Sequence, residues 1–416
     1  MRTLALFFLL LPWAVPAANE DLFIEVQSEG IQKMDIAVCA FARKGEAAAR
    51  KGAADLWKVI ANDLKLSGRF NVTEVKEADT AFLRGKGIPV LIDGKTGAEG
   101  DKITLECFLR DANTLNLIAG KEYAVKETEA RRAAHLFSDE VVYRLFGEKG
   151  VAATRIVCVA QVGKAKEICM VDYDGAGLTR LTSNNQLNLS PRFSADNKAV
   201  VYTSYRQKTP ALYVSHIYTG KTERVTANAR LNFAPAWSPV DDCIAFATSL
   251  TGECDIYTMD PDGSNLKRLT LTEAIESSPC WSPNGYEIAY TSDRTGNPQI
   301  YIMDNEGGNA RRLTYEGKYN DSPCWSPKGD KIAYVSMEGS RFDVYTLDLD
   351  GSNVKRLTEG PGSNEHPGFS PDGRLLVFSS TRAGGSDLYL MNLDGTDQTR
   401  ITFSGNLSSP AWSGYY

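Results

Sequence analysis

The sequence predicts a multidomain protein: a small α/β domain followed by an all-β propeller of six blades. One strand-rich unit recurs at steps of 44, 44, 44, 44 and 43 residues, marked by Pro191, Pro235, Pro279, Pro323, Pro367 and Pro410. An aromatic residue stands two positions after each proline, and short alternating apolar segments follow the first five. Several units end in R-L-T, at 180–182, 268–270, 312–314 and 356–358. Four short strands in a unit of about 44 residues is the pattern of a propeller blade.

The phase of the repeat predicts how the ring closes. Sets of three strands should begin near residues 155, 199, 243, 287, 331 and 375, and inner strands near 190, 234, 278, 322, 366 and 409. The propeller, 154–416, therefore opens with three strands that lack an inner strand and ends with an inner strand alone. We expect residues 408–416 to complete the first blade and leave no free edge, so their loss should open the ring.

Residues 18–148 lack the repeat and predict the α/β domain. Apolar residues at helical spacing indicate helices over 46–67 and 128–146, each followed by a glycine that can end it. Strands are expected over 22–27, 34–41, 70–75, 88–92, 103–110 and 115–125. Residues 147–153 form a short linker to the propeller.

Residues 1–17 have the composition of a signal peptide. A positive charge and an apolar run precede the small residues Val15 and Ala17, so cleavage is expected near Ala17 or Ala18. The apolar run is too short for an ordinary transmembrane helix and no second one follows. We therefore expect Sec-dependent export and no membrane span in the mature protein; the alternative is a retained N-terminal anchor.

Eight cysteines in an exported chain raise the question of disulfides. Cys158 and Cys169 are symmetric about the turn of a predicted hairpin, so they should face each other, and a disulfide between them is allowed. Cys280 and Cys324 occupy the same position in neighbouring blades, where they are expected to be small buried fillers.

Several classes of function are disfavoured by composition and motifs. A net charge of −6 does not suit a nucleic-acid-binding face. The three histidines are far apart, with no H-E-x-x-H segment, and there is no G-x-S-x-G. The acidic D-x-D-G segments lack the glutamate that would close a calcium loop, so we interpret them as turns. We expect no catalytic residue, no cofactor and no metal site, and a structural role for His135.

Six loops lead from the last strand of one blade to the inner strand of the next, near 183–190, 227–234, 271–278, 315–322, 359–366 and 403–409. All must emerge on one face, around the mouth of the central channel. They carry polar residues suited to hydrogen bonding: Asn185, Arg230, Asn232, Glu276, Ser277, Asn320, Asp321, Asn364 and Glu365. Loops on a rigid scaffold often carry binding residues, so this face is a candidate docking surface.

Over essentially its whole length the chain resembles the TolB family of the Tol–Pal system. Propeller repeats of this type also occur in prolyl oligopeptidases and tricorn-like proteases, so the N-terminal half is the more specific part. The matching segments are A-D-L at 54–56, L-x-x-S-G-R-F-N at 64–71, A-H-x-x-S-D-E-V at 134–141, L-F-G-x-K-G at 145–150, T-R-I at 154–156 and P-A-W-S at 410–413.

This resemblance implies a non-enzymatic scaffold in the Gram-negative periplasm that supports outer-membrane integrity and invagination during cell division. TolA is expected to bind the mature N-terminus by strand addition, at Leu22, Phe23, Ile24, Glu25 and Val26. The lipoprotein Pal is expected at the channel mouth, near Arg230, Asn232, Glu276, Ser277, Asn320, Asp321, Asn364 and Glu365. Other outer-membrane proteins are further expected partners. Leu231 stands where the family has a loop histidine.

Two other functions stay open: an enzyme with its site in the channel, and a propeller that binds cell-wall saccharides. An enzyme needs acids, bases or metal ligands that converge from several blades. The inner-strand positions offer few of them: Arg192, Ala236, Cys280, Cys324, Gly368 and Ala411. Aromatic residues on the inner strands could stack on sugars, but their fixed place in every blade favours packing.

Overall fold

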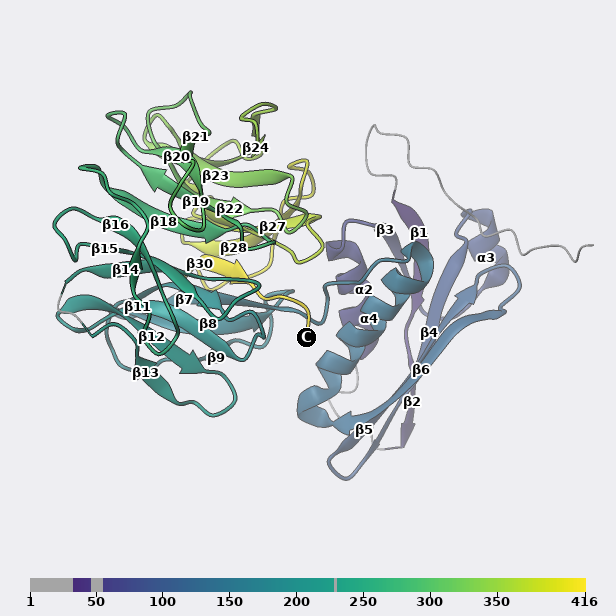
Figure 1. Ribbon diagram of the computed structural model, residues 1–416. Helices are drawn as coiled ribbons and strands as arrows, with labels where there is room; N and C mark the ends of the chain where they lie inside the picture. Colours follow the sequence, from purple (N-terminus) through teal and green to yellow (C-terminus); the bar gives the residue numbers. More distant parts are fainter. Residues whose placement is uncertain (1–32, 46–54, 228–229) are drawn as a thin grey trace, which may run out of the picture. The chain divides into compact units, whose positions relative to one another are not determined.

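The computed structural model describes residues 33–45, 55–227 and 230–416. The expected signal peptide and the expected strand over 22–27 lie outside these ranges. Lys33–Tyr416 form one compact unit, in which a mixed sheet with helices precedes six four-stranded sheets (Figure 1). The predicted fold class is confirmed. Within the described ranges, none of the helices is both long and apolar enough to cross a membrane.

The α/β region is built on a sheet of order β3-β1-β4-β5-β6, with β2 paired to β4. Its strands are β1 (Met34–Cys39), β2 (Ala42–Gly45), β3 (Phe70–Val75), β4 (Val90–Glu99), β5 (Lys102–Asp111) and β6 (Leu117–Lys126). β1 runs parallel to β3 and β4, whereas β4, β5 and β6 form an antiparallel meander. The helices are α2 (Leu56–Leu66), α3 (Thr80–Gly85) and α4 (Ala130–Phe146), with a 3₁₀ turn, η2 (Glu127–Glu129), ahead of α4.

Helices α2 and α4 lie side by side on one face of this sheet (Figure 1). Ile60 and Leu64 of α2 and Phe137 of α4 are fully buried in the same apolar cluster. The helix α4 ends at Gly147, whose φ of 71° is the left-handed conformation that favours glycine. The buried side of the helix pair also carries two polar residues, Asp63 and His135, and the Asp63 carbonyl oxygen and the His135 side chain contact the propeller.

The propeller contains six four-stranded sheets, five of them made of consecutive strands. From the innermost strand outward, the first sheet contains β10 (Asn188–Phe193), β11 (Ala199–Gln207), β12 (Thr209–His216) and β13 (Thr222–Arg224). The second contains β14 (Asn232–Trp237), β15 (Ile244–Thr248), β16 (Asp255–Met259) and β17 (Lys267–Arg268). The third is β18 (Glu276–Trp281), β19 (Glu287–Ser292), β20 (Gln299–Asp304) and β21 (Arg311–Arg312). The fourth contains β22 (Asn320–Trp325), β23 (Lys331–Glu338), β24 (Arg341–Asp348) and β25 (Lys355–Arg356). The fifth contains β26 (Asn364–Phe369), β27 (Leu375–Ser380), β28 (Asp387–Asn392) and β29 (Thr399–Arg400).

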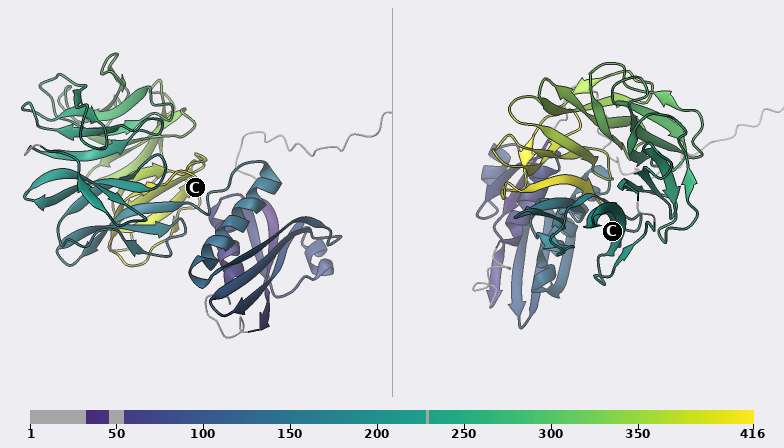
Figure 2. Two further views of the ribbon diagram at one scale, coloured as in Figure 1. Left: turned by 60° about the horizontal axis from the view of Figure 1, so that its bottom comes forward. Right: turned by 90° about the vertical axis from the view of Figure 1, so that its left-hand side faces the viewer.

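The sixth sheet joins the two ends of the propeller. From inside outward it contains β30 (Leu407–Trp412), β7 (Arg155–Val162), β8 (Ala165–Asp172) and β9 (Thr179–Arg180). Trp412 lies opposite Ile156 in the ladder, and the yellow C-terminal strand lies beside β7 in Figures 1 and 2. The Trp412 ring nitrogen also donates to Thr154 Oγ1 at 2.7 Å. Hydrogen bonds between the first and last propeller strands therefore close the ring.

Every inner strand carries a β-bulge at its proline. The ladder register shifts at the same place in all six sheets. The residue before each proline has φ between 49° and 56°: Ser190, Ala234, Ser278, Ser322, His366 and Ser409. Proline has no N–H for the ladder, and a bulge is where a strand accommodates it. A bulge re-aims the strand, so residues before the proline can face differently from those after it.

The D-x-D-G segments, and the similar N-L-D-G segment at 392–395, form hairpin turns, as predicted. Their glycines, Gly175, Gly263, Gly351 and Gly395, have φ between 83° and 87°. A Cβ atom on Gly175 would lie 1.9 Å from the carbonyl oxygen of Ile401 in the neighbouring sheet. Glycine is needed there both for the backbone conformation and for this close approach.

Two short elements were not predicted from the sequence pattern. β2 follows β1 after a short break, and α3 lies in a stretch without a long apolar repeat. The start of α3 does have a signal, because the Asp79 carboxylate accepts the N–H groups of Ala81 and Phe82 as a helix cap.

Cys158 and Cys169 lie directly opposite each other on β7 and β8, as the hairpin register predicted. Both thiols are free, so the disulfide that this pairing allows is absent from the structure. Both side chains are buried in an apolar cluster with Val171 and Leu390, where a thiol packs as a small hydrophobic group.

Deletion of residues 408–416 should open the ring, because β7 then loses its inner partner and becomes a free edge. We expect hydrogen exchange at the amides of Ile156–Ala160 to become fast and cooperative unfolding to be lost. A synthetic peptide of residues 407–416, added in trans, should restore part of the protection. Full protection of β7 in the truncated chain would contradict closure by β30.

Candidate functional site

The loops that link the outermost strand of one sheet to the innermost strand of the next share one end of the propeller. Neighbouring strands in every propeller sheet are antiparallel, so consecutive connections alternate between the two ends. We call the end that carries these loops the loop face; its described segments are 181–187, 225–227, 230–231, 269–275, 313–319, 357–363 and 401–406. The turns between the first and second strands and between the third and fourth strands lie at the opposite end, the turn face.

A buried hydrogen-bond network joins consecutive blades beneath the loop face. Asp343 of β24 accepts Thr358 Oγ1 at 2.7 Å and Asn364 Nδ2 at 2.8 Å, both at Oδ1. Thr358 follows β25, whereas Asn364 opens the inner strand of the next sheet. Asn364 Oδ1 in turn accepts Ser380 Oγ at 2.7 Å. We call this network, with its counterparts in the other blades, the inter-blade latch.

The R-L-T motif supplies the outer half of the latch. Arg356 binds the second carboxylate oxygen of Asp343 at 2.5 Å, Leu357 is buried, and Thr358 Oγ1 accepts the backbone N–H of Val344 at 2.9 Å. The equivalent threonine accepts a backbone N–H of the third strand in every sheet: Thr182, Thr226, Thr270, Thr314, Thr358 and Thr402. The contacts of its three residues therefore explain why the R-L-T motif recurs in the sequence.

Four residues expected to contact a partner have buried side chains, and two of them, Asn320 and Asn364, bind the preceding blade. Asn232, Glu276, Asn320 and Asn364 are 0, 0, 1 and 0% exposed. Asn320 donates to Gln299 Oε1 at 2.9 Å, and Glu276 binds the Arg294 guanidinium. Buried polar groups need such partners, and a docking protein could reach these side chains only by breaking them. A binding role for these four residues stays a prediction.

The other four expected residues are accessible. Arg230 is exposed, and Ser277, Asp321 and Glu365 are half-buried. The last three directly follow latch positions, and strand alternation directs each side chain away from its buried neighbour. They come from three consecutive inner strands, β18, β22 and β26. The structure thus brings polar groups from neighbouring blades to the loop face.

His366 of β26 lies near these polar groups but stays neutral at pH 7. Burial and the positive charge of Arg192 lower its pKa to about 4, and the negative charge of Asp321 opposes them. Its Nδ1 is 4.0 Å from a Glu365 carboxylate oxygen, which is too far for a hydrogen bond. A neutral, half-buried imidazole at this position favours packing over acid–base chemistry.

Apolar side chains of the loop face were missed by the sequence analysis. The large exposed ones are Leu187, Leu231, Leu271, Ile275, Tyr315 and Phe403, at 40 to 77% exposure. We call the first five, which belong to four consecutive loops, the apolar arc. A signal for it existed, since Leu187, Leu231 and Ile275 recur at the repeat step of 44 residues.

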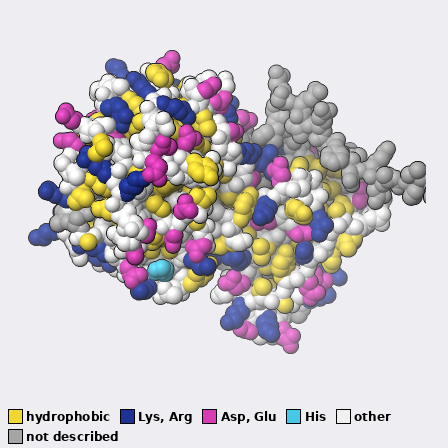
Figure 3. Space-filling view, in the orientation of Figure 1, with side chains coloured by type: hydrophobic (Ala, Val, Ile, Leu, Met, Phe, Trp, Pro, Cys, Tyr) yellow, Lys and Arg dark blue, Asp and Glu magenta, His cyan; other side chains and the backbone are white. Residues whose placement is uncertain are grey.

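Backbone hydrogen bonds hold the apolar arc in place. Three of its carbonyl oxygens accept an N–H from the end of the second strand: Leu187 from Tyr205 at 2.9 Å, Leu231 from Ser249 at 3.1 Å, and Ile275 from Asp293 at 3.3 Å. A surface fixed in this way loses little conformational freedom when a partner binds. In the view of Figure 3, basic and acidic side chains are interspersed and form no basic face of the kind that binds nucleic acid.

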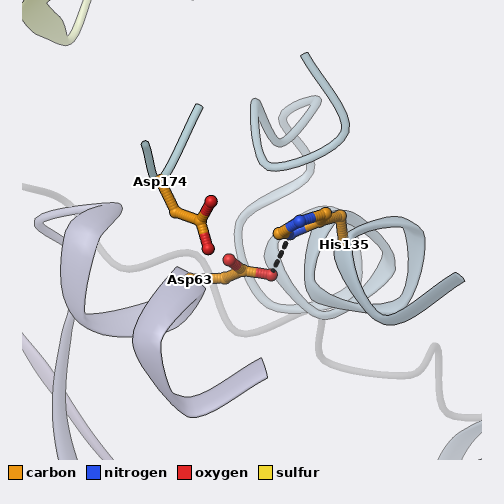
Figure 4. Close-up of side chains that lie close together, drawn as sticks. All are labelled: Asp63, His135 and Asp174. Carbon is orange, nitrogen blue, oxygen red and sulfur yellow. Dashed lines mark hydrogen bonds and ion pairs between the residues drawn. The ribbon is translucent and has the colours of Figure 1, made fainter. Parts of the chain in front are cut away.

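At the turn face, a second cluster joins the propeller to the α/β region. His135 Nδ1 of α4 and Asp63 Oδ2 of α2 are 2.8 Å apart, and Asp174, in the turn between β8 and β9, points toward the same place (Figure 4). Asp63, His135 and Asp174 each offer a ligand atom within 4.8 Å of the others, so among the described residues they are the group that could hold a metal ion. His135 Nε2 is 3.8 Å from Asp172 Oδ2.

The electrostatics of this cluster favour a positive charge at its centre. Burial by itself would lower the pKa of His135, but the charges and hydrogen bonds of Asp63 and Asp172 outweigh burial and raise it to about 10. His135 was expected to be structural, and its partners could not be identified from the sequence. Asp63 and Asp174 belong to other elements, and only the folded chain brings the three together.

Other contacts of the α/β region also reach turns at the turn face. Tyr173 donates its hydroxyl to the Asp63 carbonyl oxygen at 2.8 Å. Lys33 pairs with Asp397 at 2.7 Å, in the turn between β28 and β29. These contacts engage one end of the propeller, while the apolar arc lies at the other.

Family comparisons cover both parts of the chain. Residues 142–416 match the family described as the TolB beta propeller domain, and residues 22–117 match the TolB amino-terminal domain. A solved structure, that of TolB from Acinetobacter baumannii, is similar over 92% of this chain and 97% of its own, with 28% identity and a TM-score of 0.81.

Curated relatives match over a shorter stretch. A protein named Tol-Pal system protein TolB from Cereibacter sphaeroides is 33% identical over 227 residues, which are 50% of this chain and 51% of that protein. A protein of the same name from Geobacter sulfurreducens is 39% identical over 191 residues, 43% of this chain and 44% of the relative. The chain thus spans about half the length of the curated relatives that it matches.

Replacement of Asn364 by alanine should destabilise the propeller, because Asp343 and Ser380 lose their shared partner. An unpaired buried polar group costs about 1–3 kcal/mol, so we expect a loss of that order in the free energy of unfolding. Chemical denaturation followed by circular dichroism measures it. The matched control is Asn406→Ala at an exposed asparagine, which should change little. Equal effects of the two changes would contradict the latch.

Proposed function

The chain belongs to the TolB family, and on that premise we propose that it is a periplasmic, non-enzymatic scaffold of the Tol–Pal system. In this proposal, Pal binds the loop face and TolA binds the mature N-terminus. The assembly supports outer-membrane integrity and invagination during cell division, and other outer-membrane proteins are further partners. The observation that carries the proposal is the apolar arc beside the half-buried polar groups of the loop face.

An apolar centre with polar neighbours is the composition of a protein-binding surface. Leu231, Leu271 and Ile275 are 44, 77 and 51% exposed, although large apolar side chains of this kind are usually buried. Complete burial of one such side chain contributes about 1.5–3 kcal/mol, so two or three can dominate an interface. Arg230, Ser277, Asp321 and Glu365 then supply hydrogen bonds and orientation at the edge.

The contacts of the α/β region with the turn face support a separate place for each partner. The propeller residues in these contacts, Asp172, Tyr173, Asp174 and Asp397, belong to strand ends and turns opposite the loops. Pal can then bind the loop face without displacing the α/β region. The expected TolA segment, 22–26, lies outside the described residues. Its alternating pattern supports strand addition, in which main-chain hydrogen bonds provide the affinity.

The inner-strand aromatics support a scaffold over a saccharide-binding propeller. Phe193, Trp281, Trp325 and Phe369 are buried. The Trp281 ring nitrogen donates to the carbonyl oxygen of Ala236 in the adjacent blade at 3.1 Å. Side chains that pack between blades in this way are not available to stack on sugars.

Replacement of Leu231 by aspartate should weaken Pal binding at least tenfold, because a charge would be desolvated in the apolar centre of the interface. Isothermal titration of the purified chain with the Pal periplasmic domain measures this effect. The matched control is Leu266→Asp: Leu266 is also 44% exposed but lies in the turn between β16 and β17, at the turn face. Equal losses in both variants would place the Pal site elsewhere.

Deletion of residues 18–26 should abolish TolA binding and leave Pal affinity within twofold of the intact chain, because the proposed sites are separate. Surface plasmon resonance with immobilised TolA and Pal domains tests both arms on one preparation. If the deletion removes both interactions while thermal unfolding is unchanged, the proposal of two sites fails.

A further inference from the structure

The acidic turns of the propeller are equivalent in sequence but not in surroundings. Asp174, Asp262 and Asp350 each accept the backbone N–H two residues ahead, at 3.1, 2.8 and 2.9 Å. This hydrogen bond explains an aspartate in all three turns. Asp262 and Asp350 are exposed, however, whereas the Asp174 side chain is only 6% exposed and faces Asp63 and His135 (Figure 4). The turn motif does not explain why this one copy is buried beside another carboxylate.

Two ligand-type atoms in this cluster have no hydrogen-bond partner among the described residues: Asp63 Oδ1 and His135 Nε2. Their side chains are 0 and 3% exposed. Buried polar atoms are nearly always paired, and leaving one unpaired costs about 1–3 kcal/mol. Two unpaired atoms in one small cluster therefore indicate a bound group that the side chains alone do not supply.

The carboxylates of the cluster suit a bound cation. Three carboxylates meet here, those of Asp63, Asp172 and Asp174. Arg131 lies 2.5 Å from Asp174 Oδ2 and 3.8 Å from Asp172 Oδ2, and Arg155 is 4.0 Å from Asp172. Asp63, the most deeply buried of the three acids, pairs with neither arginine; its partner is His135 Nδ1 at 2.8 Å, and a metal ion bound to both would take the place of the imidazole proton. Buried carboxylates are commonly compensated by a paired charge or a metal ion.

From this arrangement we propose that Asp63, His135 and Asp174 bind a divalent transition-metal ion, with zinc as the expected ion. One imidazole and two carboxylates are a ligand set that zinc accepts with low coordination numbers. Calcium takes six to eight oxygen ligands, and magnesium usually keeps several waters, which a buried site of three residues does not suit. Imidazole also shifts the preference toward zinc and its neighbours in the transition series.

The surrounding residues hold the ligands in position. Ser138 Oγ donates to Asp63 Oδ2 at 2.8 Å, and Arg131 binds Asp174. Tyr173, next to Asp174, donates its hydroxyl to the backbone of Asp63. Such second contacts orient metal ligands. A bound ion would tie α2 and α4 to the turn between β8 and β9, so it would stabilise the contact between the α/β region and the turn face.

The test uses the full chain without an affinity tag, stripped with a chelator and then equilibrated with Zn²⁺. We expect one zinc per chain after gel filtration, measured by inductively coupled plasma mass spectrometry, and a higher midpoint of thermal unfolding with zinc present. Because the chain has free thiols, Co²⁺ serves as a second probe. Its spectrum should lack the intense charge-transfer band of a cobalt–thiolate bond.

Asp174→Asn should weaken zinc binding at least tenfold and abolish the thermal shift. Asparagine keeps a side-chain oxygen for the N–H of Ala176, so the turn should persist, and circular dichroism checks the fold. Asp350→Asn, the same change in an equivalent exposed turn, should leave binding unchanged. His135→Gln gives a second loss in a different element. No retained zinc, equal affinities of the two asparagine variants, or a cobalt–thiolate band would overturn the proposal.

Discussion

Buried hydrogen bonds to the preceding blade hold the start of three inner strands, β10, β22 and β26, in place. An asparagine such as Asn364 satisfies its amide only if Asp343 of the preceding sheet and Ser380 of its own sheet are both in place. A buried polar group that loses its partner costs free energy comparable to a lost hydrogen bond or more. The latch therefore helps to set the spacing of neighbouring sheets. The R-L-T motif supports it, because Arg356 binds Asp343, and the bulge at the proline re-aims the strand that carries Asn364.

Because of this constraint, neighbouring residues of an inner strand have different roles: some side chains hold the fold together and others are accessible to a partner. The latch position is buried, the residue after it faces away, and the loop ahead of it carries the apolar arc on a backbone held by the adjacent strand. Polar character alone was a poor guide to function for this reason. Asn320 and Asp321 are neighbours of similar polarity, and both bind the preceding blade, yet Asn320 is buried whereas Asp321 is half-buried at the loop face.

Repetition gives the propeller two ends with different uses. At the loop face, equivalent positions differ in side chain, with leucine or isoleucine in three loops, so the surface is asymmetric although the backbone repeats. At the turn face, equivalent aspartates share one backbone role, but only Asp174 meets the helix pair of the α/β region. Function in this molecule resides where side chains or neighbouring elements break the repeat.

The sequence by itself determined the fold class and the number of blades, because these depend on local periodicity, turn chemistry and spacing. Within the propeller, strand phase and the opposition of Cys158 and Cys169 follow from the same local information. Tertiary structure alone decided which polar residues are buried between blades, since burial depends on the neighbouring sheet. It also brought Asp63, His135 and Asp174 together. Three elements that are distant along the chain meet there, and a local sequence pattern does not show which distant elements come into contact.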